Sequence, residues 1–244
     1  MRVALYNQMF GLNGRSLISN ILGHYFVHWQ KNPKRVFSRI NLDEGIKIVK
    51  ESNADLLGIC EIYEGQEEKI VEELKKLGYK YFYFGKGHRF KYNDRHVVEL
   101  LASKFKGKQL NFEGWPLENK IGGGGGFIVC KFENPKVNVF HVHLGMPIRN
   151  FFKKQIKYMK EIVKQLDGKT ILMGDFNYCW KDLQRHFFDF RLATGELKTC
   201  STTPIIKWFY NKDIDHVLVK GFKLVKRGVL EGRSDHKLIY ADLK

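Results

Sequence analysis

Several polar residues of this chain stand where a short apolar segment ends. Asn7 closes the segment ALYN, Glu61 closes GICE, and His143 closes VFHVH. Ligands of α/β proteins gather at strand ends, so these side chains are candidates for one shared site. The same pattern recurs in the segments GDFN, IDH and SDH, which carry Asp175, Asn177, Asp215, Asp235 and His236.

Together these residues offer amides, carboxylates and imidazoles, and none of the segments contains a serine or cysteine nucleophile motif. Oxygen donors suit a hard divalent cation, and such a cation suits the hydrolysis of a charged ester. Asp175 and Asn177 are two residues apart, so both face the same way in an extended segment. Gly174 leaves room for a close approach to that face. The combination therefore predicts a hydrolytic site that uses a metal ion.

Each of these residues has an ordinary structural explanation when it is taken alone. A single Asp before a turn usually caps that turn. A single His in a strand is more often a core residue, which is what we expect of His141. Only the combination of residues indicates chemistry.

Short apolar runs alternate with helical patterns along the whole chain, which predicts one α/β domain over residues 1–244. The helical pattern at residues 16–30 places Leu17, Ile21, Tyr25 and Trp29 on one stripe. Further helices are expected at residues 42–51, 66–77 and 151–166. Strands are expected at residues 3–7, 55–61, 79–84, 127–132, 136–144, 170–176, 214–219, 222–229 and 238–243, with a hairpin over 97–113.

The composition is typical of a folded domain, with 43% hydrophobic and 14% aromatic residues in a chain of 244. No apolar run approaches the roughly 20 residues of a membrane-spanning helix, and the first residues lack a signal-peptide pattern. The four cysteines are scattered without a C-x-x-C pair, which indicates reduced thiols. We therefore expect a cytoplasmic monomer without an integral membrane segment.

Lys and Arg number 42 against 26 Asp and Glu, a formal net charge of +16. This excess favours a polyanionic partner, although net charge reports on non-specific binding rather than on fold. Two basic clusters in loop-like sequence, around Lys34 and around Arg89, are candidates for phosphate contacts. A third, on residues 153–160, is typical of a solvated helix face. The glycine run at 122–126 lacks the Lys-Ser/Thr of a P-loop, so we interpret it as a loop that leads into a strand.

The order of these motifs resembles the endonuclease/exonuclease/phosphatase superfamily, whose members include deoxyribonuclease I and exonuclease III. The resemblance runs nearly end to end and rests on ALYN, GICE, VHL, GDFN, the T-x-P segment that contains Thr203, IDHVLV and SDH. It implies a deoxyribonuclease I-like four-layer α/β sandwich, in which helices flank two packed mixed sheets. It also implies magnesium-dependent phosphoester cleavage.

Carried over residue by residue, the resemblance implies that Glu61 is the principal ligand of Mg²⁺, with Mn²⁺ as a possible substitute. Asp235 and Asn7 would contribute directly or through water. Because Mg²⁺ keeps several of its waters, one or two carboxylates suffice to hold it. The resemblance further implies that Asp175 orients or deprotonates the attacking water.

The resemblance also implies contacts to the phosphate. Asn177 would donate an amide hydrogen to it, and His236, paired with Asp215, would contact the phosphoryl oxygens. His143 would be a second imidazole contact, with Glu99 as a candidate acidic partner. Thr203, Lys34 and Arg89 complete the expected substrate contacts.

This chain departs from the family pattern at two places. Cys60 stands where many relatives have Gln before the metal-binding Glu. The stretch between Asn7 and Glu61 is longer than expected, which indicates a helical insertion at about residues 14–40. We expect it to pack on the sandwich as an extra helix. The alternative is an aromatic and basic surface for bases or lipid headgroups.

The leading hypothesis is a metal-dependent phosphodiesterase or nuclease that acts on DNA or RNA, because the net charge favours a polyanion. A second hypothesis keeps the site and changes the substrate to a phosphorylated small molecule, such as an inositol phosphate, or to a phospholipid headgroup. A third is a non-catalytic binding module, which the complete set of site residues disfavours.

Overall fold

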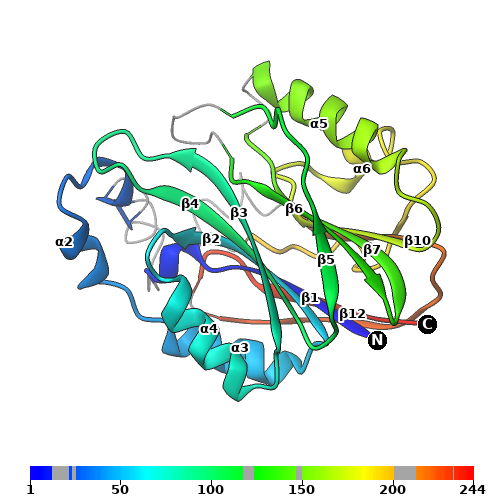
Figure 1. Cartoon of the computed structure of the whole chain (residues 1–244), viewed down its shortest axis with the longest axis horizontal. Helices are drawn as coiled ribbons and strands as arrows, with labels where there is room; N and C mark the ends of the chain where they lie inside the picture. The colour runs from blue at the N-terminus through cyan, green and yellow to red at the C-terminus, as the bar shows by residue number, and fades with distance from the viewer. Residues whose placement is uncertain (13–21, 24–25, 118–123, 147–149, 201–212, 233) are drawn as a thin grey trace.

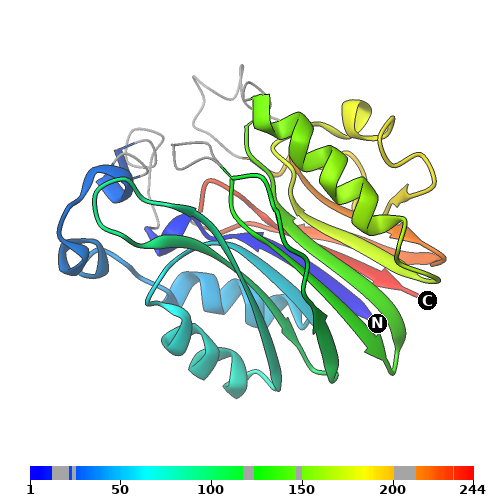
Figure 2. The same cartoon turned by 45° about the horizontal axis from the view of Figure 1, so that its top comes forward.

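The computed structural model describes residues 1–12, 22–23, 26–117, 124–146, 150–200, 213–232 and 234–244. These residues form two six-stranded mixed sheets that pack face to face, with helices on the outer faces (Figures 1 and 2). The predicted four-layer α/β sandwich is thereby confirmed. No helix among the described residues is long and apolar enough to cross a membrane.

The first sheet has the strand order β11-β12-β1-β2-β4-β3. β1 and β2 run parallel, and the other pairs are antiparallel. The central strands are almost wholly buried because both of their faces are covered. The strands are β1 (Arg2–Asn7), β2 (Leu56–Tyr63), β3 (Tyr81–Arg89), β4 (His96–Ser103), β11 (Leu224–Leu230) and β12 (Leu238–Leu243).

The second sheet has the order β5-β6-β7-β8-β10-β9, with β7 and β8 as its parallel pair. Both sheets therefore place a parallel pair near their centres, and these pairs end close to the candidate residues. The strands are β5 (Gly107–Leu110), β6 (Phe127–Glu133), β7 (Lys136–His143), β8 (Thr170–Asp175), β9 (Arg191–Leu192) and β10 (Asp215–Lys220).

Three apolar layers hold the sandwich together. The middle layer lies between the sheets and includes Leu5, Phe132 and Ile171. The outer layers lie under α3 and α4 on the first sheet and under α5 and α6 on the second. The helical elements are η1 (Met9–Gly11), α2 (Pro33–Phe37), α3 (Asp43–Ser52), α4 (Glu67–Lys76), α5 (Asn150–Val163) and α6 (Trp180–Leu183).

The hairpin predicted over residues 97–113 was wrong. β4 and β5 belong to different sheets: β4 pairs with β2 and β3, whereas β5 pairs with β6. Both edges of β4 are already occupied, so β5 has no edge of β4 to join. The chain instead passes from one sheet to the other, in a turn where the Ser103 hydroxyl donates to the carbonyl of Phe105.

β3 extends to Arg89, beyond the predicted end at residue 84. Arg89 is therefore on a strand rather than in a loop, whereas Lys91 and Arg95 of the same basic cluster lie in the turn that follows. Two glycines permit this extension. A Cβ atom on Gly85 would collide with the backbone of Phe127, and one on Gly87 with the backbone of Gly125. Glycine is needed at both positions because the backbone of the second sheet lies so close.

The described part of the region expected as a helical insertion differs from the prediction in the side chains that it buries. Residues 22–23 and 26–29 are helical, and Leu17, Ile21 and Tyr25 lie outside the described residues. Trp29, predicted on the buried stripe, is 56% exposed, and Val27 and His28 are buried in its place. They pack with Phe10 and Phe90 over one end of the first sheet.

Candidate active site

The strand registers bring the candidate residues to one end of the sandwich. Asn7 lies opposite Cys60 across the parallel pair β1 and β2, so Asn7 and Glu61 leave the first sheet together. In the second sheet, Asp175 lies between His143 on β7 and Asp215 on β10. The two sets face each other because the sheets pack with these ends together.

The carboxylate of Asp175 is the point on which the site converges. Its Oδ2 accepts a hydrogen bond from Asn7 Nδ2 at 3.0 Å and lies 3.8 Å from Nε2 of both His143 and His236. Its Oδ1 accepts from the backbone N–H of Asn177 at 2.8 Å. A buried carboxylate is thus held between one amide and two imidazoles that come from both sheets.

Burial raises the pKa of Asp175 to about 6, and the neighbouring Asp215 adds to the rise. The imidazoles of His236 and His143 act in the opposite direction. At neutral pH such a carboxyl is mostly ionised, yet it remains basic enough to accept a proton. Asp175 therefore has the protonation behaviour that a general base requires.

His236 and Asp215 form a buried pair, with 2.7 Å between Nδ1 and the carboxylate Oδ2. Burial alone lowers the pKa of His236, but the charges of Asp215 and Asp235 raise it well above its ordinary value. Ser234 fixes the loop that carries the ring. Its hydroxyl donates to the carbonyl of Asn7 at 2.7 Å and accepts from the His236 N–H at 3.2 Å.

His143 forms a second pair, with Glu99 of β4, and 3.3 Å separates its Nδ1 from the Oε1 of Glu99. Burial lowers the pKa of His143, but the bond to Glu99 and the charges of Asp175 and Glu61 raise it to about 9. Burial also raises the pKa of Glu99 to about 7. Both rings thus have Nδ1 at a carboxylate and Nε2 turned toward Asp175, so two imidazolium donors face one base.

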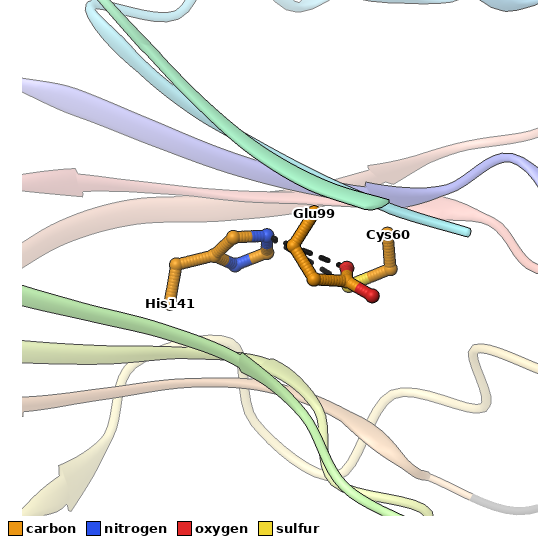
Figure 3. A group of neighbouring side chains, drawn as sticks. All are labelled: Cys60, Glu99 and His141. Carbon is orange, nitrogen blue, oxygen red and sulfur yellow. Dashed lines mark hydrogen bonds and ion pairs between the residues drawn. The ribbon is translucent and has the colours of Figure 1, made fainter. Parts of the chain in front are cut away.

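A cluster behind Glu99 holds that carboxylate in the core (Figure 3). Cys60 comes from β2 and His141 from β7, and the Sγ and the Glu99 Oε2 each lie 3.9 Å from His141 Nε2. The same nitrogen lies 3.3 Å from the carbonyl of Ile59. Burial lowers the pKa of His141 to about 4, so the ring is a neutral core residue, as predicted. Nδ1 of the same ring lies 3.3 Å from the carbonyl of Met173, so both ring nitrogens face the core backbone, and we interpret the cluster as a support for Glu99 rather than a metal site.

Glu61 is placed by an irregularity in its strand. The register between β2 and β4 shifts between Ile59 and Ile62, and Glu61 has a φ of 59°. This left-handed conformation is unfavourable for a residue with a side chain and is typical of functional sites. Glu61 Oε1 consequently lies 3.8 Å from His143 Nε2, with 12% of the side chain exposed.

Asp235 and Asn177 were also predicted for this site. Asp235 is half-buried beside the pair, and its Oδ1 lies 3.2 Å from the Ser234 hydroxyl oxygen. Asn177 adopts a φ of 51°, and its side-chain amide donates to the carbonyl of Leu144 at 2.8 Å. One amide hydrogen of Asn177 is thus engaged with the backbone.

Two predicted substrate contacts, Lys34 and Arg89, lie on elements that carry neither Asp175 nor the two imidazoles. Lys34 is exposed on α2, and Arg89 ends β3 in an ion pair with Asp94. Thr203 lies outside the described residues.

The donor set fits a divalent cation. In the described part of the chain the carboxylates of Glu61, Glu99, Asp175, Asp215 and Asp235 outnumber the two charged imidazoles at this end. Such an excess of buried negative charge is costly without a cation. Glu61 and Asp235 are the partly exposed members, so they are the ones open to a hydrated ion. Hard oxygen donors of this kind suit Mg²⁺.

Two residues near the site were missed or given little weight by the sequence analysis. Glu99 has a detectable signal, since it is the one acidic residue in the apolar strand HVVELLAS and a buried carboxylate needs a partner. His88 on β3 is buried, with its Nδ1 2.6 Å from the carbonyl of Gly124. Burial lowers its pKa to about 4, so it is a neutral ring at the edge of the site. Nothing in the pattern around His88 distinguished it.

Carboxylates, amides and two acid-supported imidazoles at one end of a two-sheet sandwich define a class, the hydrolases of phosphoester bonds. The model of the Endonuclease/Exonuclease/phosphatase family matches residues 20–236, and the chain belongs to this family. No curated protein matches the sequence significantly.

Solved structures show the same fold at low sequence identity. An endonuclease/exonuclease/phosphatase from Beutenbergia cavernae DSM 12333 has a TM-score of 0.71 at 17% identity, covering 100% of this chain and 71% of that one. An AP endonuclease from Archaeoglobus fulgidus has a TM-score of 0.62 at 16% identity, with 100% and 99% covered. The mannosyl-6-phosphatase Bt3783 from Bacteroides thetaiotaomicron VPI-5482 has 0.55 at 16% identity, again with 100% and 99% covered. The fold thus accommodates both nucleases and phosphatases.

Proposed function

We propose that the protein is a Mg²⁺-dependent phosphodiesterase that cleaves nucleic acid. The observation that carries the proposal is the convergence on Asp175 Oδ2, which has one amide at 3.0 Å and two imidazole nitrogens at 3.8 Å. A carboxylate in this position is suited to take a proton from water while the imidazoles donate to the phosphoryl oxygens.

The roles follow from the hydrogen bonds of each residue. Asp175 accepts the proton of the attacking water, whose oxygen forms the new bond to phosphorus as the bond to the leaving oxygen breaks. His143 and His236 keep Nε2 protonated because Nδ1 of each ring lies at a carboxylate, so both rings donate to developing negative charge. Asn7 orients Asp175 through its amide, which fixes the carboxylate plane.

The metal would be held by Glu61 and Asp235, with Asn7 contributing through its side-chain oxygen or through water. That oxygen already accepts from the Met9 N–H at 3.0 Å, which leaves one lone pair. When bound, the ion supplies charge neutralisation and Lewis-acid polarisation of the phosphate.

Nucleic acid is the favoured substrate because of the charge distribution. The net charge is +16, and no Asp or Glu occurs before Asp43. The basic residues on α2 and at the end of β3 lie on the elements that border the catalytic end of the first sheet. A surface of this sign attracts a polyanion and raises its rate of association.

The test is a hydrolysis screen with and without Mg²⁺ over single-stranded DNA, duplex DNA, RNA, a phosphomonoester and a phospholipid diester. We expect cleavage of at least one nucleic acid, loss of activity in EDTA, and recovery on addition of Mg²⁺ or Mn²⁺. The Asp175→Asn variant is the control for contaminating nucleases, since a contaminant would cleave equally in both preparations. Full activity in EDTA would exclude the metal assignment. Turnover of the phosphomonoester alone would replace the nuclease with a phosphatase.

A further inference from the structure

Trp29 of the insertion and the partly exposed Tyr92 of the turn after β3 form an aromatic pair, which we call the aromatic platform. The two rings are stacked with 5.1 Å between centroids and 28° between planes. Trp29 is 56% exposed, although a Trp of this size is normally well buried. The Trp29–Tyr92 stack therefore leaves a large part of the indole surface open to solvent.

The aromatic platform is held firmly to the body of the protein. Asn93, next to Tyr92, donates from its side-chain amide to the carbonyl of Gln30 at 2.8 Å, which ties the loop after β3 to the end of the helical segment. On the inner side, His28 and Phe90 pack against each other with 4.9 Å between ring centroids. Because the rings are already ordered, a ligand that stacks on them pays little further conformational entropy.

The two segments that carry the aromatic platform, 26–39 and 88–95, are rich in basic residues and poor in acidic ones. The Lys91 ammonium lies 4.9 Å from the centre of the Tyr92 ring, and the Arg39 guanidinium lies 4.0 Å from the ring of Phe26. Within these two segments, the exposed basic residues that make no ion pair with any described carboxylate are Lys31, Lys34, Arg35, Arg39 and Lys91. The only acidic residue within segments 26–39 and 88–95 is Asp94, which pairs with Arg89.

A short series of contacts connects the aromatic platform to the candidate active site. His28, the neighbour of Trp29, stacks on His88 with 5.4 Å between centroids and 6° between planes. His88 contacts the carbonyl of Gly124. The next residue, Gly125, donates its N–H to the carbonyl of His143 at 3.0 Å. The aromatic platform thus lies beside the catalytic end of the sandwich, where β3 and the insertion meet.

We propose that the aromatic platform binds an unpaired base of a single-stranded nucleic acid whose backbone is contacted by the surrounding lysines and arginines. This inference rests on the proposed nuclease function and narrows its substrate to strands with accessible base faces. Any of the nucleobases can stack on Trp29, and cations beside the rings attract the phosphates on either side of the stacked base. In a duplex both faces of each internal base are covered, so a duplex gains nothing from the aromatic platform.

A lipid surface is less well matched by these residues. Membrane-binding helices present several apolar side chains together along one face. In the described part of the insertion only Leu22 and Trp29 are large apolar side chains with high exposure, 60% and 56%, and Trp29 is already stacked on a second ring. Two exposed apolar side chains fall short of a membrane-binding face, whereas a stacked, exposed indole with a lysine beside its partner ring is typical of a base-binding site.

The experiment measures binding with the Asp175→Asn protein in Mg²⁺, so that the probe is not cleaved. The probe is a fluorescein-labelled oligodeoxythymidylate of about 12 nucleotides, and its own duplex with oligodeoxyadenylate is the comparison. Trp29→Ala removes the exposed ring, and Trp29→Phe keeps a stacking surface. Phe188→Ala is the matched control, because Phe188 is an aromatic residue that is 85% exposed elsewhere on the molecule.

We expect Trp29→Ala to weaken single-strand binding by about 5- to 150-fold, the range for the loss of one stacked base. Trp29→Phe should restore most of that loss, and duplex binding should change less than about twofold. Phe188→Ala should bind like the parent. Equal losses for single strand and duplex would overturn the proposal, because the indole would then act only through the fold or through charge. Unchanged single-strand binding would overturn it as well.

Two further measurements separate this inference from the proposed function. In the otherwise native protein, Trp29→Ala should cleave a small diester, bis(p-nitrophenyl) phosphate, at the parental rate, which shows that the catalytic residues are intact. Sedimentation with phosphatidylserine vesicles tests the lipid alternative, and vesicle binding that depends on Trp29 without oligonucleotide binding would refute the aromatic platform as a base site. If the native protein cleaves no nucleic acid, the proposed function fails. If it cleaves single strands and Trp29→Ala leaves this unchanged, only the present inference fails.

Discussion

The pair formed by Asp215 and His236 offers the sharpest test of the proposed chemistry. Its atoms are 2.7 Å apart and its side chains are 2% and 8% exposed, so water cannot replace a lost partner. A hydrogen bond to a charged group contributes about 1.5–3 kcal/mol. If that energy supports the protonated ring in the transition state, Asp215→Asn should lower kcat by about 10- to 150-fold. His236→Ala should lower it by about 100-fold or more.

The effect of Asp215→Asn on activity should depend on pH in a definite direction. The charges of Asp215 and Asp235 raise the pKa of His236, so the native ring keeps its proton well above its ordinary range. Without the Asp215 charge the ring loses its proton at a lower pH. The ratio of native to Asp215→Asn activity should therefore grow as the pH rises from mildly acidic to alkaline. A ratio that is constant with pH would mean that Asp215 does not sustain the charge on His236.

A double-variant cycle completes the test. Single-turnover hydrolysis of a labelled diester is measured for the native protein, both single variants and the double variant, each checked for an unchanged melting temperature. When two residues act as one unit, replacing both lowers the rate of hydrolysis little more than replacing the more important one alone. The double variant should therefore resemble His236→Ala. Multiplication of the two single losses would show that Asp215 does not act through His236, and the pair would have to be abandoned.

Four further predictions concern the other groups of the site and the acid limit of the fold. Asp175→Asn should abolish turnover while it preserves or strengthens substrate binding measured by fluorescence polarisation, since the proton acceptor and one negative charge are lost; weaker binding would contradict this. Glu61→Gln should raise the Mg²⁺ concentration needed for half-maximal activity and leave the circular dichroism spectrum unchanged, whereas an unfolded variant would make Glu61 structural. Affinity for duplex DNA should fall with salt at a log-log slope of about −0.9 per phosphate contact, and a flat response would favour a small or lipid phosphate. Although burial opposes it, hydrogen bonds from Lys86 and His96 lower the pKa of Glu64 to about 2, so Glu64 stabilises the fold above its unfolded pKa of about 4.3 and loses that contribution as the pH falls toward 2. Chemical unfolding should accordingly show a smaller loss of stability between pH 5 and pH 2.5 for Glu64→Gln than for the native protein, by on the order of 1 kcal/mol.

The sequence predicted several residues of the candidate site because they lie at or near the ends of apolar strands. Asn7, Glu61 and Asp175 follow apolar runs, and the strand pattern depends on neighbouring residues alone. The pairing of His236 with Asp215 was suggested by a family resemblance. In the structure His236 Nδ1 lies 2.7 Å from Asp215 Oδ2, and His236 is carried by a loop that no local sequence pattern predicts.

The errors have a common physical cause. The hairpin over residues 97–113 failed because strand pairing depends on which edges other strands leave free, and β2 and β3 occupy both edges of β4. Trp29 was expected inside because helical periodicity identifies an apolar stripe, but only the packing of Phe10 and Phe90 decides which side of the segment is covered. Periodicity reports the faces of an element and says nothing of what lies opposite.

The amino-acid sequence by itself determined the chemistry available to this protein: its carboxylates, amides and imidazoles at strand ends, its α/β class and its excess of positive charge. The tertiary structure decided which of these groups act together. Glu99 becomes the partner of His143, with Cys60 and His141 behind it, only because strands from two sheets meet in one core. The local sequence determines which segments form strands and helices and which types of side chain each segment carries. Contacts between residues far apart in the chain depend on how the layers pack, and these contacts set the pKa values and the geometry of the site.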